Sequence, residues 1–228
     1  MKKDMTGQTF YARVVKRGFD IVLCGLALVI LSPLFLITAA AIRLSSPGPV
    51  FYASDRVGIN GELFHFFKFR SMHVTNADKG LHVADADRVF PVGKIIRRLK
   101  IDELPQLVNV IRGDMSIVGP RPMVTASLDE MYGGKYRRVL TVRPGLTSAA
   151  SLYDYTVGDT YTDEKAYMAE IVPMKSEMEL YYVERQSFAY DAQLVGRTIV
   201  TILAVLFHAR LPEQKEYTLC RERLNAAE

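Results

Sequence analysis

An uncharged apolar run at residues 21–42 constrains the fold of this chain more than any other feature. As a helix its 22 residues would rise about 33 Å, which is enough to cross the hydrocarbon core of a bilayer. Only 24% of the 228 residues are charged and 49% are hydrophobic, as in a chain with a substantial core. A cleaved signal peptide is disfavoured because the apolar run is too long for one. The sequence therefore predicts one membrane element joined to a folded domain.

Ser32-Pro33 lies in the middle of this run. A proline cannot donate to the carbonyl four residues earlier, and its ring clashes there, so the helix has to kink or break. Two paths stay open: a single spanning helix with a proline kink, and a re-entrant hairpin of two short helices that enters one leaflet and returns. Lys16 and Arg17 before the run and Arg43 after it do not decide between these paths.

The net charge of +4 is confined to the N-terminal segment. Residues 1–17 contain five basic residues and one acidic residue, and the rest of the chain contains equal numbers of each. Such a segment favours anionic head groups and the cytoplasmic side of a membrane. A nucleic-acid-binding function is disfavoured, because no helix carries a basic stripe. Two cysteines and four scattered histidines exclude a disulfide scaffold and a zinc site built from them.

The remaining sequence predicts an α+β fold that is mostly helical. Residues 50–58 and 59–72 read as two strands of a small β-hairpin that turns at Asn60-Gly61. Residues 114–123 should be extended and end in a proline turn, and residues 143–148 should form another turn. Helical patterns cover residues 92–113, 125–142, 161–188 (interrupted near Pro173) and 194–207.

The predicted organisation has three parts. Residues 1–44 form the basic N-terminus and the membrane helix-break-helix, residues 45–211 the cytosolic domain with interfacial amphipathic helices, and residues 212–228 a charged, frayed tail. A mobile loop is expected at residues 74–87.

The densest cluster of charged residues, RRLKIDELPQ at 97–106, contains two adjacent carboxylates, Asp102 and Glu103. On a helix they would point about 100° apart, so they suit divided roles better than a shared proton. One carboxylate can attack a phosphoryl group while the other holds a cation, and a helix N-terminus would keep such a group ionised. The other interpretation is a solvated helix start with Asp102 as its N-cap, and a merely rigid turn at GPRP.

Phosphoryl chemistry also needs cations that neutralise the developing charge. The chain offers Lys68, Arg70, Arg88, Arg97, Arg121 and Arg143.

The order of these motifs resembles the bacterial sugar transferase family, the small monotopic polyprenyl-phosphate phosphoglycosyl transferases. The resemblance covers roughly residues 13–205, and RPGLTS belongs to it. Its longer matching segments are KRGFDIVLCGLALVILSPLF, SSPGPVFYASDRVGINGELFHFFKFRSM and DADRVFPVGKIIRRLKIDELPQLVNVIRGDMSIVGPRP.

The resemblance implies transfer of a phospho-sugar from a UDP-sugar to a polyprenol phosphate, expected to be undecaprenyl phosphate, with release of UMP. Asp102 would be the nucleophile that forms a covalent phosphosugar intermediate, and Glu103 would help to hold Mg²⁺. The substrate site would include Pro120, Arg121 and Pro122.

The resemblance also favours a re-entrant break at Ser32-Pro33, at the cytoplasmic face of the bacterial inner membrane. Membrane lipid would be a partner, and downstream glycosyltransferases and a second copy of the chain are further candidates. The alternative is a catalytically inactive membrane scaffold of the same fold. Residues 146–150 (LTSAA) depart from the usual ITGWA, and the change to Ser148 falls where a loop would need a positive φ. With 20 residues before the apolar run, we expect the small form of the family.

Overall fold

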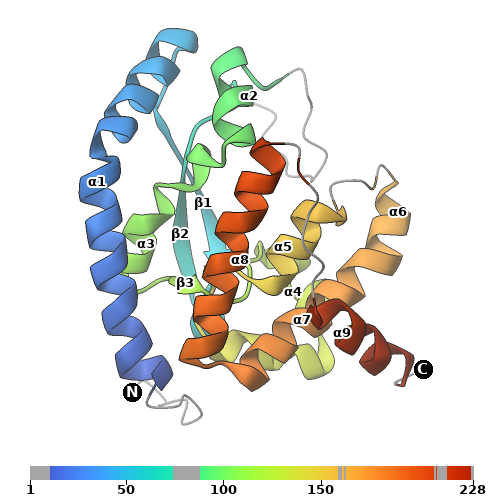
Figure 1. Cartoon of the computed structure of the whole chain (residues 1–228). Helices are drawn as coiled ribbons and strands as arrows, with labels where there is room; N and C mark the ends of the chain where they lie inside the picture. Colours follow the sequence, from blue (N-terminus) through green and yellow to red (C-terminus); the bar gives the residue numbers. More distant parts are fainter. Residues whose placement is uncertain are drawn as a thin grey trace.

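A computed structural model describes residues 11–73, 88–158, 161, 163–207, 209 and 215–226. The described helices are α1 (Lys16–Ser45), α2 (Pro91–Arg98), α3 (Gln106–Arg112), α4 (Leu128–Tyr132), α5 (Ala149–Thr156), α6 (Glu164–Ala166), α7 (Val172–Arg185), α8 (Phe188–Leu206) and α9 (Lys215–Asn225). The described strands are β1 (Phe51–Val57), β2 (Leu63–Phe69), β3 (Ser116–Val118) and β4 (Gly145–Thr147). In Figure 1, α1 forms one side of the molecule and α6 and α9 the other, with the strands, α3 and α8 between them. The predicted α+β class is confirmed.

The apolar run forms one continuous helix, α1, that contains Pro33. The Ser32 hydroxyl donates a hydrogen bond of 2.8 Å to the carbonyl of Val29. That carbonyl is the one that Pro33, lacking an N–H, cannot bond. Figure 1 shows α1 bending along its length without interruption. The structure therefore does not confirm the two separate helices expected from the sequence.

One face of α1 is exposed and apolar, and the other packs on the domain. Residues Tyr11–Ser45 form one helical run that is long and apolar enough to cross a membrane, judged by length and composition within the described residues. On the packed face, Cys24 joins a buried cluster with Phe66, Leu107 and Met115. The long apolar helix and the domain thus share a core.

The predicted hairpin is confirmed. β1 and β2 pair antiparallel, from Phe51 opposite Phe69 to Val57 opposite Leu63. Asn60 (φ 60°) and Gly61 (φ 79°) both have left-handed backbone, which an Asn-Gly turn tolerates.

A second, two-stranded sheet was not predicted. β3 and β4 pair in parallel, so part of the expected turn at residues 143–148 is strand instead. The backbones at Gly119 and Gly145 approach so closely that a Cβ on Gly145 would lie 2.1 Å from the Gly119 nitrogen. A residue with a side chain does not fit there, and this contact brings the turn at residues 120–122 beside residues 143–145.

The C-terminal half is helical and centred on α7. The expected interruption near Pro173 is not a break: residues 164–185 are helical throughout, and a π-helical turn (Tyr167–Ile171) leads directly into α7, with Pro173 in its first turn. The region 125–142 is mostly 3₁₀ turns (Thr125–Ser127 and Gly134–Thr141) around the short α4, instead of one helix. Helix α5 was not predicted.

The expectation of a frayed C-terminal tail is wrong for α9. Its Cys220 and Glu216 are buried, and Arg223 lies 3.0 Å from Glu184 of α7. Burial of one face explains why a sequence rich in charge is ordered here. The expected loop at 74–87 lies outside the described residues, and the three-part division of the chain stays a prediction.

Candidate active site

Asp102 and Glu103 lie in a tight turn between α2 and α3. The chain leaves α2 at Arg98, Lys100 adopts a left-handed conformation (φ 55°), and residues Ile101–Glu103 form one 3₁₀ turn. The apolar periodicity across 92–113 is therefore shared by two helices and not by one. The turn presents both carboxylates to β2, which passes beside it.

Two distant segments converge on this turn. Lys68 of β2 donates a 2.9 Å hydrogen bond to Glu103 Oε1, and its ammonium nitrogen is 3.8 Å from Asp102 Oδ2. The Arg121 guanidinium, from the turn after β3, is 3.8 Å from the same Glu103 oxygen. Four of the residues proposed from the sequence thus form one cluster of two carboxylates and two cations.

The two carboxylates have opposite electrostatic surroundings. Burial raises the pKa of Asp102 above its usual value, and Lys68 offsets part of that rise. Burial also disfavours ionised Glu103, but Lys68 and Arg121 outweigh it and lower its pKa to about 2. Glu103 is thus a fixed negative charge. The direction for Asp102 is opposite to the expectation that the helix terminus would favour ionisation.

Three buried polar atoms on residues from Arg97 to Gln106 lack hydrogen-bond partners in the part of the chain that the structure describes. Within the described residues, Asp102 Oδ1, Gln106 Nε2 and Arg97 Nη1 are buried and make no hydrogen bond. Such atoms are rare in native proteins, and a cluster of them is typical of a site that binds a polar ligand. Gln106, only 2% exposed, was not among the predicted site residues. Its spacing of four residues from Asp102 was the signal available in the sequence.

Two predicted cations lie elsewhere. Arg70 donates four hydrogen bonds to Ser46, Pro47 and Pro49, so it fastens the end of β2 to the loop after α1. Arg143 donates to the Gly113 carbonyl at the opposite end of α3 from the carboxylate turn. Neither is placed to neutralise charge at Asp102.

The other predicted residues have less defined roles. Arg88 lies where the chain re-enters the described part, and its carbonyl accepts from the His73 N–H. Pro120 and Pro122 flank Arg121, and the Pro120 carbonyl accepts from the Gly145 N–H at 2.8 Å. The roles of Arg88 and Arg97 in substrate binding stay predictions.

Ser148 does not need a positive φ. Its backbone is extended (φ −155°), and its hydroxyl accepts from the Ser151 N–H to cap α5. The same hydroxyl donates to the buried Glu179 at 2.9 Å. A serine at this position is therefore unstrained and has polar partners.

The site suits a divalent cation only together with a substrate. Within the described residues, no group of three or more His, Cys, Asp or Glu side chains could hold a metal ion. Mg²⁺, however, is commonly bound by one or two carboxylates plus substrate phosphates and water. The ionised Glu103 and the unpartnered oxygen of Asp102 fit that pattern.

The sequence model of the bacterial sugar transferases matches residues 11–205 of this chain. The chain belongs to the bacterial sugar transferase family. The match includes α1, both sheets, the carboxylate turn and nearly all of α8.

Relatives in this family include two undecaprenyl-phosphate sugar-phosphate transferases and an exopolysaccharide production protein. A UDP-N-acetylgalactosamine-undecaprenyl-phosphate N-acetylgalactosaminephosphotransferase of Aeromonas hydrophila is 40% identical over 83% of this chain. A UDP-glucose:undecaprenyl-phosphate glucose-1-phosphate transferase of Caulobacter vibrioides is 39% identical over 82% of it. The exopolysaccharide production protein ExoY of Sinorhizobium fredii is 35% identical over 83% of it. The matched regions cover 44%, 69% and 85% of these relatives, so the chain spans less than half of the Aeromonas protein.

Proposed function

We propose that this protein transfers a phospho-sugar from a UDP-sugar to undecaprenyl phosphate and releases UMP. The observation that carries the proposal is the half-satisfied, buried Asp102 beside the Lys68–Glu103–Arg121 cluster. The names of the Aeromonas and Caulobacter relatives supply the two substrate classes. The transferred sugar is left open, because those two relatives differ in it.

The reaction would take place in two displacements. An Asp102 oxygen attacks the β-phosphorus of the UDP-sugar, the bond from that phosphorus to the bridging oxygen breaks, and UMP leaves with the electron pair. A phosphate oxygen of the lipid then attacks the same phosphorus, which releases the Asp102 carboxylate and forms a sugar–diphosphate lipid. Lys68 and Arg121 are placed to neutralise charge on the transferring group. Mg²⁺ bound through Glu103 would add further neutralisation of the diphosphate.

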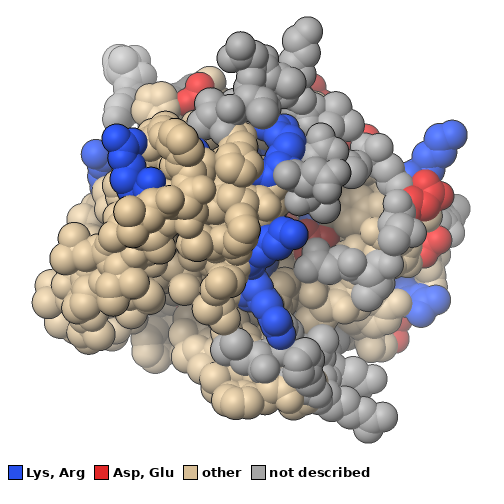
Figure 2. Space-filling model, turned by 90° about the horizontal axis from the view of Figure 1, so that it is seen from above, with Lys and Arg blue, Asp and Glu red and all other residues tan. Residues whose placement is uncertain are grey.

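Membrane placement follows from the acceptor. A lipid phosphate stays at head-group level, so the site has to lie there. The exposed apolar side of α1 and the exposed Ile199, Val200 and Leu203 of α8 suit contact with lipid. Figure 2 shows Lys and Arg side chains beside broad uncharged areas on the face viewed there. We propose a re-entrant path for α1 that leaves the domain on the cytoplasmic face. Further protein partners and a dimer stay predictions.

Trapping of the intermediate tests the proposal. Incubation with a panel of UDP-sugars, without lipid, should add a phosphosugar mass to the intact protein. Asp102→Asn should remove both the adduct and UMP release, whereas Asp129→Asn, a surface carboxylate paired with Arg137, should retain them. An active Asp102→Asn enzyme would refute the covalent role. Absence of UMP release with every UDP-sugar, undecaprenyl phosphate and Mg²⁺ would instead favour the scaffold.

The metal requirement is tested separately. Excess chelator should stop UMP release, and added Mg²⁺ should restore it, because a diphosphate needs a hard cation with oxygen ligands. Glu103→Gln should raise the Mg²⁺ concentration needed for half-maximal rate and lower the rate itself. Full activity in excess chelator would contradict the proposal.

A further inference from the structure

The main-chain N–H and carbonyl of Arg121, which lies in a turn, are each hydrogen-bonded by a side chain from a helix. The Arg121 N–H donates to Glu179 Oε1 of α7 at 3.0 Å. The Arg121 carbonyl accepts from the Tyr132 hydroxyl of α4 at 3.1 Å. The neighbouring Gly119 N–H, in contrast, bonds ordinary backbone, the Thr147 carbonyl, at 3.0 Å. The pairing between backbones therefore ends just before Arg121, and side chains take over.

Glu179 is an unusual residue for this purpose. It is 1% exposed, and its Oε1 accepts from Arg121 and from the Ser148 hydroxyl. Its other oxygen, Oε2, is buried and has no hydrogen-bond partner within the described residues. A carboxyl group in such a place destabilises the fold unless its bonds compensate. Its two bonds lead only to the Arg121 turn and to the start of α5, so holding this turn is the function that the geometry offers it.

We propose that Glu179 and Tyr132 are positioning residues that act through Arg121, fixing its main chain so that the guanidinium stays beside Glu103. The guanidinium is 3.8 Å from Glu103 Oε1 and its side chain is 42% exposed, so its own contacts constrain it weakly. A displacement of about 1 Å at a catalytic site can reduce the rate about a hundredfold. This inference rests on the proposed function only in that Arg121 serves the transfer reaction.

Three replacements separate positioning from packing. Glu179→Gln keeps an acceptor oxygen for the Arg121 N–H, whereas Glu179→Ala removes it. Tyr132→Phe removes only the hydroxyl and keeps the ring, which packs against Met131 and Val139. We expect Glu179→Ala to lower kcat/KM for UMP release about tenfold or more and Tyr132→Phe severalfold, as for loss of one partner of a buried hydrogen bond. Glu179→Gln should stay within about threefold of the wild type, because it restores the acceptor.

A double-mutant cycle with Arg121→Ala gives the deciding kinetic readout. If Glu179 and Tyr132 act through Arg121, neither Glu179→Ala nor Tyr132→Phe should lower the residual activity of Arg121→Ala further. Equal losses in both backgrounds would overturn the proposal. If Glu179→Ala does not fold, the Tyr132→Phe cycle alone decides.

Amide exchange, followed by NMR in detergent, supplies a readout that needs no activity. The Arg121 N–H should exchange faster in Glu179→Ala than in Glu179→Gln, while the Gly119 N–H should be unchanged in both. Unchanged exchange at Arg121 would also overturn the proposal. A wild type that releases no UMP would defeat the proposed function instead, and the exchange result would still decide whether Glu179 holds this turn.

Discussion

At the scale of single residues, Glu179 links chemistry to stability. Burial raises its pKa from the usual 4.5 to about 7, although the Arg121 N–H, Ser148 and Lys175 favour the ionised form. Tyr132 also faces this carboxyl group. Between pH 4.5 and 7 the folded protein retains a proton that the unfolded chain has released. The free energy of unfolding should therefore fall as the pH rises through this window.

Replacing Glu179 with Gln should remove that pH dependence. Between pH 4.5 and 8, the wild type should lose on the order of 3 kcal/mol relative to Glu179→Gln, since one pKa unit corresponds to about 1.4 kcal/mol. Thermal unfolding of both proteins at several pH values measures the difference, with the exposed Glu130→Gln as control. Parallel curves for the wild type and Glu179→Gln would contradict the assignment.

Not every residue predicted from the motifs lies in the charged cluster. Lys68, Asp102, Glu103 and Arg121 were predicted from charge and spacing, and they converge in the structure. Arg70 comes from the same short motif as Lys68, yet it bonds to carbonyls of a loop. Residues two apart share a face of a strand, but β2 ends at Phe69, so Arg70 lies beyond the strand and meets the loop after α1. Local sequence does not reveal where the strand ends relative to the site.

At the scale of elements, α1 shows how a proline is accommodated in an apolar helix. The Ser32 hydroxyl satisfies the Val29 carbonyl, so the helix bends and stays continuous. An unsatisfied backbone carbonyl in lipid costs on the order of several kcal/mol, and the hydrogen bond from Ser32 avoids that cost.

The path of α1 can be tested by cysteine labelling. One labelling site before residue 16 and one within residues 74–87 should react from the same side if the segment is re-entrant. Replacing Ser32-Pro33 with Ala-Leu removes the cause of the bend and should favour crossing, which places the two sites on opposite sides. Reaction from opposite sides in the unmodified chain would contradict the re-entrant path.

Elements with local causes were predictable and elements with distant causes were not. The Asn60-Gly61 hairpin follows from its turn residues. The parallel pair β3–β4 joins three-residue strands that are more than 25 residues apart, and short segments carry little pattern. Helix α9 is ordered by packing against α7, and its charged sequence does not predict that contact.

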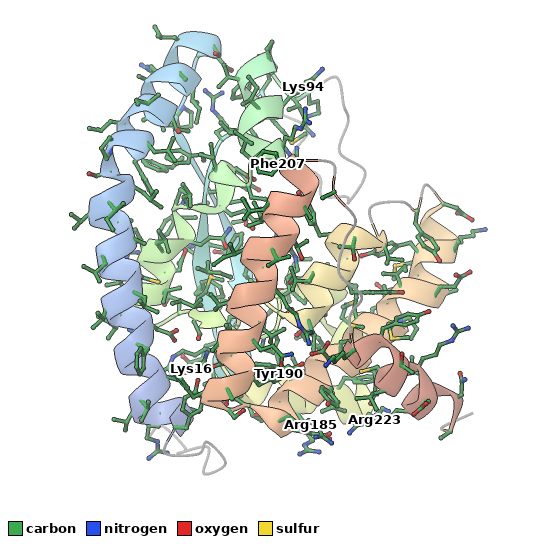
Figure 3. All side chains as sticks on the ribbon, in the orientation of Figure 1. Lys16, Lys94, Arg185, Tyr190, Phe207 and Arg223 are labelled. Atoms are coloured by element: carbon green, nitrogen blue, oxygen red, sulfur yellow. The ribbon has the colours of Figure 1, made fainter. Side chains whose placement is uncertain are left out.

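At the scale of the whole molecule, a buried ion pair joins the two ends of the family match. The Lys16 ammonium of α1 lies 2.6 Å from Asp191 Oδ2 of α8, and each side chain is less than a tenth exposed. Asp191 also accepts from the hydroxyls of Tyr11 and Tyr182. Figure 3 shows Lys16 beside the beginning of α8.

Breaking this pair should destabilise the whole fold. Asp191→Asn leaves the Lys16 charge buried without its counter-ion, which should cost about 3–5 kcal/mol of unfolding free energy. The double replacement Lys16→Met with Asp191→Asn should recover much of it, because Asn keeps an acceptor oxygen for the tyrosine hydroxyls. Denaturant unfolding in detergent measures both, and Asp129→Asn, at an exposed pair, should change less than about 1 kcal/mol. A loss at Asp191 no larger than at Asp129 would contradict this.

The contacts of α1 bear on how the protein can be handled at the bench. Besides Lys16, Arg17 donates to the carbonyls of Val110 and Ile111 at the end of α3. Asp20 accepts from the Ser116 hydroxyl and the Ile117 N–H at the start of the parallel sheet. Truncation before Ser46 would strip these partners from the remaining domain and expose the Phe66–Met115 cluster to water. Residues 46–228 therefore do not form a domain with a removable N-terminal helix, and we expect purification to require a detergent or lipid that keeps α1 in place.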